Sequence, residues 1–434
     1  MSPELIGILG IVALFVLLAL RMPVAVALMI VGTGGIALLS NSRAALATLG
    51  SETFVIATKI ELTIIPLFVL MGNLASQSGL SRNLYDAAYA WVGHWRGGLA
   101  SATVVGCSGF AALSGSSVAS AITMGRVALP EMKRYEYDNR LATGSVAAGG
   151  TLGILIPPST GFVIYAILTE ESIGRLFMAG ILPGLLLTGL FIVTITLLTM
   201  WRPSYGPAGP HTQFAEKLVA LAKAGPLLAI IAITIGGIYG GVFSPMEAAG
   251  VGALLTLAVA LYRRSLTWGS FGKILLQTVR ISAMSYLILI GAHVFSPFLA
   301  RTDIPGLLTE ALIGLGLGSY GTLIIILIAF IILGTFLEGF AMLVLTLPIV
   351  FPLILALGFD PIWFGVIMVI VLEMGLITPP VGVNVFVVKS IAPGVPMGRI
   401  FAGIAPFWFA MLACLIILLI APQIVLLLPD TMFG

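Results

Sequence analysis

Two pairs of adjacent prolines, Pro157–Pro158 and Pro379–Pro380, stand inside long apolar stretches of the sequence. Adjacent prolines remove two amide donors and bias the preceding residue away from helical dihedral angles, so a helix must unwind there. Unwinding frees carbonyl oxygens, which at membrane depth survive only inside protein or beside a polar cavity. Freed carbonyl oxygens with nearby hydroxyl groups can coordinate a dehydrated sodium ion. Both pairs are therefore candidate cation sites.

Small and polar residues interrupt two further apolar stretches. Residues 114–117 read Ser-Gly-Ser-Ser, and residues 334–339 read Gly-Thr-Phe-Leu-Glu-Gly. We interpret the stretches 97–129 and 320–351 as re-entrant hairpins, each entering and leaving the membrane on one side, with tips that meet the broken helices. Close helix packing is the competing interpretation of the serines, because small residues favour it.

The composition is that of a membrane protein. Of the 434 residues, 9% are charged and 59% are hydrophobic, and the mean hydropathy is +1.17. Soluble domains carry about 25% charged residues, so a soluble enzyme, a disordered regulator and a nucleic-acid-binding protein are disfavoured. Cys107 and Cys414 lie in apolar surroundings, so no disulfide framework or cysteine-rich metal site is expected.

Apolar runs long enough to cross a bilayer recur along nearly the whole chain, which predicts an all-α polytopic membrane protein. The segments 81–94 and 304–317 are amphipathic enough to lie along the interface. The spans 141–168 and 361–391 contain the proline pairs and are predicted to be broken helices. The full set of predicted spans is 5–20, 23–40, 61–77, 141–168, 176–201, 225–241, 245–262, 281–299, 361–391 and 400–428.

The basic residues predict the orientation of these spans. With the N-terminus outside, all but four of the 20 Lys and Arg residues fall in cytoplasmic loops, as the positive-inside rule requires. The four that fall outside are Arg43, Lys59, Arg175 and Arg301.

The chain also repeats itself. An offset of 222 residues (379 − 157) aligns the two proline pairs and aligns Gly153 with Gly375. Each half holds five spans and a hairpin, and an odd number of crossings inverts the second copy. Inverted repeats with interrupted helices are typical of secondary transporters, whose substrate lies near the midplane. The predicted units are a first repeat over 1–201, a cytoplasmic linker over 202–223 and a second repeat over 224–434.

A channel-type subunit and a membrane-embedded enzyme are the competing functions. The polar breaks supply no ring-forming filter, which disfavours a channel. No pair of intramembrane carboxylates or histidines has catalytic or metal spacing, so no enzyme activity is expected. Glu338 and Glu373 are expected near an aqueous surface, as solvated or structural carboxylates. The glycines form no phosphate loop, and no organic cofactor is expected.

Four motifs together resemble the large membrane subunit of tripartite ATP-independent periplasmic transporters, and the resemblance covers almost the whole chain. It implies an elevator-type secondary transporter, driven by two or more sodium ions, in the bacterial inner membrane with a periplasmic N-terminus. It also implies as partners a small four-helix membrane subunit and a periplasmic binding protein that delivers an organic acid, and no nucleic acid. The motifs are Arg21-Met-Pro23, Ser114-Gly-Ser-Ser117, Gly153-Ile-Leu-Ile-Pro-Pro-Ser159 and Gly375-Leu-Ile-Thr-Pro-Pro-Val-Gly-Val-Asn384.

The resemblance assigns three groups of site residues. A first sodium site, formed mostly by backbone carbonyls, consists of Ser114, Ser117, Gly153, Ile156 and Pro158. Its pseudo-symmetric partner consists of Gly334, Thr335, Gly339, Gly375 and Thr378. The expected substrate contacts are Ser116, Ser159, Thr160 and Asn384.

The sequence departs from one branch of the family. Sialic acid members carry an arginine a few residues after the first proline pair, whereas residues 161–163 here read Gly-Phe-Val. This departure argues against sialic acid and leaves C4-dicarboxylates, keto acids or related small acids. The chain begins directly with its first span, so a separate small subunit is expected. A stand-alone sodium/dicarboxylate symporter of related fold is the runner-up.

Overall fold

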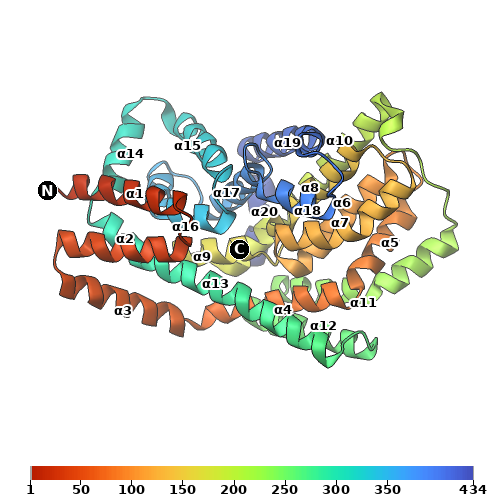
Figure 1. Ribbon diagram of the computed structural model, residues 1–434, viewed down its shortest axis with the longest axis horizontal. Coiled ribbons are helices and arrows are strands. Elements are labelled where there is room, and N and C mark those ends of the chain that lie inside the picture. Colours follow the sequence, from red (N-terminus) through yellow and green to blue (C-terminus); the bar gives the residue numbers. More distant parts are fainter. Residues whose placement is uncertain (1, 434) are drawn as a thin grey trace.

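The computed structural model describes residues 2–433, and this range is all-helical, with twenty α-helices and two 3-10 helices (Figure 1). The first half contains α1 (Pro3–Ala19), α2 (Val24–Leu39), α3 (Ser42–Thr58), η1 (Ile60–Thr63), α4 (Ile64–Gln77), α5 (Leu80–Val92), α6 (Gly98–Ser114), α7 (Ser117–Arg134), α8 (Asn139–Leu155), α9 (Thr160–Thr169), α10 (Ile173–Trp201) and η2 (Pro203–Tyr205). The second half contains α11 (Phe214–Tyr239), α12 (Pro245–Tyr262), α13 (Trp268–Ala300), α14 (Ile304–Gly314), α15 (Gly318–Gly334), α16 (Gly339–Ala356), α17 (Pro361–Leu376), α18 (Val383–Ile391), α19 (Met397–Ile420) and α20 (Gln423–Phe433).

Within the described range, eight helical segments are long and apolar enough to cross a membrane. Large apolar side chains also cover parts of the outer surface. Val12 on α1 is 53% exposed and Leu276 on α13 is 62% exposed, which suits contact with lipid rather than water. These observations confirm a multi-pass membrane protein.

The helix bounds of the two halves correspond at the offset found in the sequence. Helices α7 and α16 begin at residues 117 and 339, and α8 and α17 begin at residues 139 and 361, a difference of 222 in each case (339 − 117, 361 − 139). The first half divides one long stretch into α3, η1 and α4, whereas the second half holds the single helix α13 at the corresponding place.

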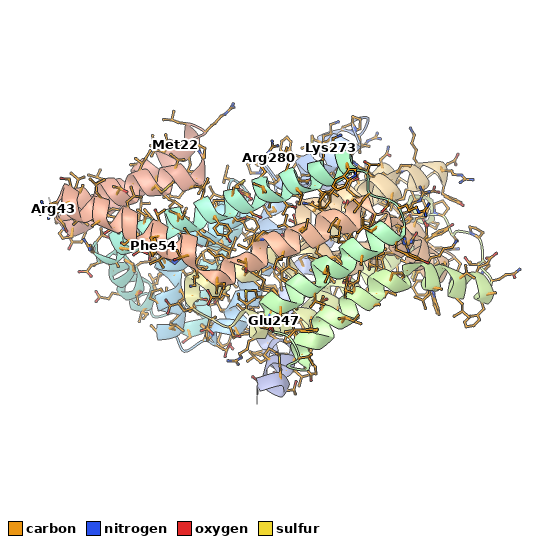
Figure 2. The ribbon with its side chains drawn as sticks, turned by 90° about the horizontal axis from the view of Figure 1, so that it is seen from below. Met22, Arg43, Phe54, Glu247, Lys273 and Arg280 are labelled. Carbon is orange, nitrogen blue, oxygen red and sulfur yellow. The ribbon has the colours of Figure 1, made fainter. Side chains whose placement is uncertain are left out.

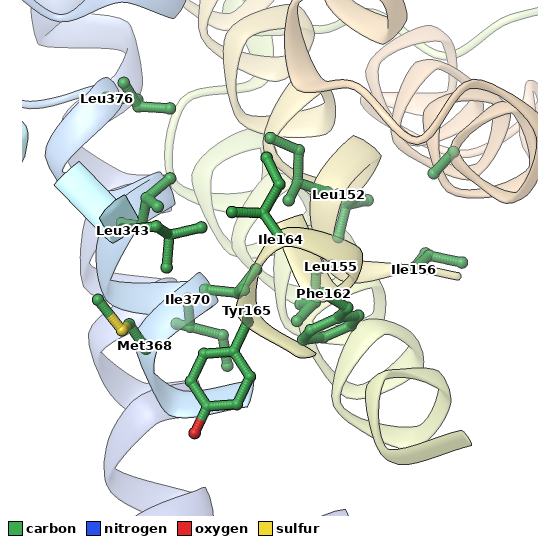
Figure 3. Packing of buried hydrophobic residues seen from close by; sticks show 14 of the residues in the cluster. Leu152, Leu155, Ile156, Phe162, Ile164, Tyr165, Leu343, Met368, Ile370 and Leu376 are labelled. Carbon is green, nitrogen blue, oxygen red and sulfur yellow. The ribbon is translucent and has the colours of Figure 1, made fainter. Parts of the chain in front are cut away.

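The two halves interleave in the core. Helix α9 of the first half packs on α16 and α17, and α18 of the second half packs on α7 and α8. Ile164 and Tyr165 on α9 lie across from Leu343 on α16 and Met368 on α17 (Figure 3). The Tyr165 hydroxyl donates to the carbonyl oxygen of Pro361 over 2.7 Å. Both broken helices are thus held by the opposite half.

Two predicted segments differ from the observed helices: the last span, 400–428, and the segment 202–223 between the halves. The predicted span 400–428 is two helices, α19 and α20, because Pro422 lies between them and cannot continue a helix. The predicted linker 202–223 contains the short 3-10 helix η2 and the first turns of α11. Helix α11 begins at Phe214, where Gln213 and Glu216 form a capping box that satisfies its first amides.

The predictions also missed or shortened two helices. The predicted span 281–299 is the last part of α13, which has 33 residues, because its polar N-terminal turns contain no breaker. Helix α3 was not predicted, since its polar residues give it a lower hydropathy than its neighbours. Asn41 caps α3 by accepting a hydrogen bond from the Ala44 amide over 2.8 Å.

The loop after α1 and the first half of α13 lie on the side of the molecule opposite the start of α12 (Figure 2). Met22, beside Arg21, lies on the same side as Lys273 and Arg280, and Glu247 lies on the opposite side (Figure 2). Glu247 sits in the first turn of α12, where its carboxylate accepts a hydrogen bond from the Ser244 amide over 2.8 Å.

Candidate ion and substrate site

The tip of the first hairpin, between α6 and α7, is a tight glycine turn. Gly115 adopts a left-handed conformation with φ of 57°. A side chain there would also bring its Cβ within 2.8 Å of the Pro158 carbonyl oxygen. Only glycine meets both requirements without strain. The tip therefore lies directly against the first proline pair.

The helix break opposite this tip is closed by hydrogen bonds. Helix α8 stops at Leu155, Ile156 is extended, and α9 starts at Thr160. The Thr160 hydroxyl donates to the Gly115 carbonyl oxygen over 2.7 Å, and the Thr160 amide donates to the same oxygen over 3.3 Å. Residues 156–158 are buried. The hairpin tip and the broken helix are thus joined by hydrogen bonds, and the break between α8 and α9 is closed to solvent.

Oxygen atoms gather at this junction, which we call the first junction. The hydroxyl oxygens of Ser114 and Ser120 lie 2.8 Å apart. A Cβ on Gly153 would lie 2.4 Å from the Ser116 carbonyl oxygen, so α8 approaches the hairpin backbone closely. Ser117 is buried at the start of α7. Ser114, Ser117, Gly153 and Pro158, which are four of the five residues predicted for the first sodium site, therefore lie at this junction.

The second predicted group is drawn together mainly by glycines. A Cβ on Gly375 would lie 2.7 Å from the Cα of Gly334, so α15 and α17 touch through their backbones. A Cβ on Gly339 would lie 2.7 Å from a methyl carbon of Leu372. These close approaches form the second junction, between the second hairpin and the second broken helix.

The two threonines of the second group already have hydrogen-bond partners. The Thr335 hydroxyl donates to the Ile332 carbonyl oxygen over 2.8 Å. The Thr378 hydroxyl donates to the Met374 carbonyl oxygen over 2.5 Å and accepts from the Trp408 indole over 3.0 Å. Their oxygens retain lone pairs, but local structure alone accounts for both orientations.

The predicted substrate contacts cap helices in the described conformation. The Ser116 hydroxyl accepts from the Ala119 amide over 3.3 Å, and the Ser159 hydroxyl accepts from the Phe162 amide over 3.2 Å. Ser159, Thr160 and Asn384 are buried, and Ser116 is half-buried. The first three are therefore closed to solvent in this conformation.

Glu373 is the residue that the sequence interpretation placed wrongly. It was expected near an aqueous surface, but it is 1% exposed because every residue of α17 from Ile362 onward is buried. The Asn384 amide donates to the Glu373 carboxylate over 3.3 Å, and α18, which carries Asn384, packs on α7, which begins at Ser117. An ionisable residue inside a predicted span is itself a signal of function. Glu338, in contrast, is exposed, as expected.

An open cavity lies away from the first junction, along the later turns of α7 and the first turns of α8. Its volume is about 600 Å³, and it lies between α7, α8 and the segment that follows α18. Arg126, Lys133 and Asn139 contribute polar groups to its wall. None of the predicted substrate contacts lines it within the described part of the chain.

The fold is that of a polytopic, all-helical membrane protein over the described residues. The fold is similar to that of the Alcanivorax borkumensis YdaH transporter, with a TM-score of 0.60, 16% identity and coverage of 90% of this chain and 89% of that one. A family model described as the tripartite ATP-independent periplasmic transporter, DctM component, matches residues 11–424, and the chain belongs to this family. This result confirms both the resemblance and the expectation that the chain is not an enzyme, since the family is one of transporters.

Individual relatives differ in the substrate that their names specify. The C4-dicarboxylate TRAP transporter large permease protein DctM of Pseudomonas aeruginosa is 39% identical over 92% of this chain and 93% of its own length. The sialic acid TRAP transporter large permease protein SiaM of Vibrio cholerae is 32% identical over 85% of this chain and 86% of its own length. Family membership alone therefore does not specify the substrate.

Proposed function

We propose that the chain is the large permease subunit of a sodium-driven tripartite transporter that imports a small organic acid, of the C4-dicarboxylate or keto acid class. A periplasmic binding protein delivers the acid, and a separate small four-helix membrane subunit completes the assembly. The two hairpins and the two broken helices form a mobile transport domain that moves as an elevator against the remaining helices. The tripartite family to which the chain belongs supports this assembly.

The observation that carries the proposal is the first junction. A hairpin tip and a helix break meet there, with Thr160 bonded to Gly115 over 2.7 Å and the hydroxyls of Ser114 and Ser120 2.8 Å apart. Irregular backbone at membrane depth is tolerated only where it is buried in protein or lines a water-filled cavity. Sodium would bind here through Ser114, Ser117, Gly153, Ile156 and Pro158, and a second ion would bind among the pseudo-symmetric group at the second junction.

The same junction suits a carboxylate substrate. Helices α7 and α9 both begin there, with Ser116 and Ser159 as their N-caps. Helix N-termini carry partial positive charge and unsatisfied amides, which favour anions. Ser116, Ser159, Thr160 and Asn384 would contact the acid. The cavity lined by Arg126 and Lys133 places positive charge between α7 and α8, where it would attract an acid anion.

The proposed substrate class rests on two comparisons. Identity to the C4-dicarboxylate permease of Pseudomonas aeruginosa is 39%, and identity to the sialic acid permease of Vibrio cholerae is 32%. Residues 161–163 also lack the arginine expected of sialic acid members. Both observations favour a small acid over a sialic acid.

The proposed location is the bacterial inner membrane, with the N-terminus in the periplasm. Sixteen of the 20 Lys and Arg residues (20 − 4) then face the cytoplasm, which the positive-inside rule favours. Met22, Lys273 and Arg280 lie on one side of the molecule, opposite Glu247, as this orientation requires (Figure 2).

Uptake into proteoliposomes tests the proposal. The chain is reconstituted with its small subunit, and the binding protein loaded with radiolabelled succinate, or with a keto acid such as pyruvate, is added outside under an inward sodium gradient. We expect uptake that requires all three components and stops when potassium replaces sodium. Ser114→Ala should shift the sodium dependence to higher concentration, since it removes one hydroxyl ligand.

The matched control is Ser51→Ala on α3, whose hydroxyl bonds only within its own helix region, to the Thr48 carbonyl oxygen over 3.2 Å. It should leave the sodium dependence unchanged. Sodium-driven uptake by this chain alone would instead support the stand-alone symporter. Uptake that is indifferent to the cation would reject sodium coupling.

A further inference from the structure

Glu373 is a buried carboxylate without a charged partner. Among the described residues the ion pairs are Arg134 with Glu131 and Arg175 with Asp430, and Glu373 belongs to neither. A buried ionised carboxylate is strongly disfavoured unless a cation compensates its charge. Glu373 is therefore either protonated or compensated by a cation that the chain itself does not supply.

The atoms around Glu373 show what that group must provide. The Asn384 Nδ2 atom donates to Oε2 of Glu373 over 3.3 Å. The second carboxylate oxygen of Glu373, Oε1, and the amide oxygen of Asn384, Oδ1, are buried and have no hydrogen-bond partner. Both atoms are acceptors in the ionised state. Two orphaned acceptors with one negative charge match the oxygen ligands that a monovalent cation requires.

The position of this cluster connects the two halves. Glu373 lies on α17 and Asn384 on α18, both of the second half, whereas Ser117 begins α7 in the first hairpin. Helix α18, which carries Asn384, packs on α7, which begins at Ser117, so the Ser117 hydroxyl is the nearest candidate for a further oxygen. Gly375, of the second predicted sodium group, follows Glu373 by two residues. The cluster thus shares Ser117 with the first predicted sodium group and is adjacent in sequence to Gly375 of the second.

We propose that Glu373, Asn384 and Ser117 form an additional sodium site that bridges the two halves, with Glu373 as its charged ligand. The inference rests on the proposed sodium coupling but uses a carboxylate that the proposed function leaves without a role. Because its ligands come from both halves, sodium bound here holds the first hairpin against the second broken helix. The site is therefore expected to fill only when these elements are in contact.

Sodium binding to the purified full chain in detergent tests the site without transport activity. Equilibrium binding of ²²Na⁺ gives the number of ions per chain, and the thermal midpoint titrated with sodium at constant ionic strength against choline gives the affinity. We expect Glu373→Gln to bind one sodium ion fewer than the wild type. The sodium affinity in the thermal titration should fall by about tenfold or more, since loss of even a supporting group costs about 10–100-fold.

Two variants make the result specific. Glu338→Gln removes an exposed carboxylate at the turn of the second hairpin and should leave both measurements unchanged. Asn384→Ala keeps the carboxylate but removes the orphaned amide oxygen, and it should weaken binding to a smaller extent. If Glu373→Gln fails to fold, the loss of affinity in Asn384→Ala decides the question.

The outcomes separate this inference from the proposed function. If Ser114→Ala weakens sodium binding while Glu373→Gln and Asn384→Ala bind the wild-type number of ions with wild-type affinity, the bridging site is rejected and the proposed function stands. If the wild type itself binds no sodium selectively, both are rejected. If Glu373→Gln loses one ion and Ser114→Ala loses another, both stand.

Discussion

The two junctions have matching helix bounds but different side chains. At the offset of 222, Glu373 corresponds to Thr151 (373 − 151) and Asn384 corresponds to Phe162 (384 − 162). Glu373 and Asn384 are bonded to each other. The Thr151 hydroxyl instead donates to a carbonyl of its own helix over 2.6 Å, and Phe162 is a fully buried apolar side chain. The pair Asn384 and Phe162 therefore has a polar side chain in the second half and an apolar one in the first.

The proline pairs of the two junctions differ in burial. Pro157 and Pro158 are buried, whereas Pro379 and Pro380 are exposed. The first break is sealed by the hairpin tip through Thr160, whereas Thr378 beside the second break is only half-buried. A repeated backbone break therefore specifies where helices unwind, and the neighbouring side chains decide whether the break is sealed, charged or open.

The largest expected effect on stability comes from truncating Phe162, the apolar counterpart of Asn384 in the first half. Phe162→Ala should lower the free energy of unfolding by about 3–5 kcal/mol, because it leaves a cavity in the sealed first junction. Asn384→Ala, at the corresponding position, should cost about 1–3 kcal/mol, mainly through the unpaired carboxylate. Denaturant unfolding in detergent measures both. Sodium titrations should change for Asn384→Ala and stay at wild type for Phe162→Ala; the reverse pattern would contradict the assignment of roles.

An intermediate effect is expected from filling the close approach in the first junction. Gly153→Ala should lower the free energy of unfolding by about 1–3 kcal/mol, because its Cβ would lie 2.4 Å from the Ser116 carbonyl oxygen. Gly189→Ala on α10 is the matched control, since a Cβ there meets nothing within 4 Å. It should be neutral or stabilise by up to about 1 kcal/mol. Equal thermal midpoints for the two variants would show that the first junction is not tightly packed.

The smallest effect is a pH dependence in the loop that follows the first broken helix. Burial raises the pKa of Glu171 above its ordinary value of 4.5, and the Asp360 carboxylate raises it further, against a smaller lowering by Arg175. Folding thus favours the protonated form. The stabilisation from this group is present below pH 4.5 and is lost as the pH rises through the raised pKa. Residues 392–396, at the corresponding place in the second half, contain no carboxylate.

Glu171→Gln should remove this part of the pH dependence. Thermal midpoints of the wild type should fall slightly relative to the variant as the pH rises from about 4 to 7, because only the wild type gains a buried charge. Arg175→Gln should enlarge the fall, since it removes the cation that offsets the shift. Parallel pH profiles for wild type and Glu171→Gln would contradict the role of this loop.

The sequence alone predicted the membrane character, most helices and the position of both helix breaks. These features depend on local rules: apolar length, two consecutive prolines, and small residues at a turn. It placed breaks at Pro157–Pro158 and Pro379–Pro380, where α8 and α17 end. It failed at α3, whose polar residues lower its hydropathy although tertiary contacts with α2 and α13 support it. It also failed at Pro422, which ends α19 inside an otherwise continuous apolar run.

The site residues, too, fall into those that local sequence motifs predicted and those that only the tertiary structure identified. Motif resemblance named Ser114, Ser117 and Gly153, because these residues lie within short sequence motifs. The burial of Glu373, its hydrogen bond with Asn384 and the approach of α18 to Ser117 on α7 depend on how α17 and α18 pack on the first hairpin. Ser117 and Glu373 are 256 residues apart (373 − 117), and no local rule relates them. Hydrophobic periodicity indicates that a helix is buried, but only the packing of the two interleaved halves decides which polar groups meet inside it.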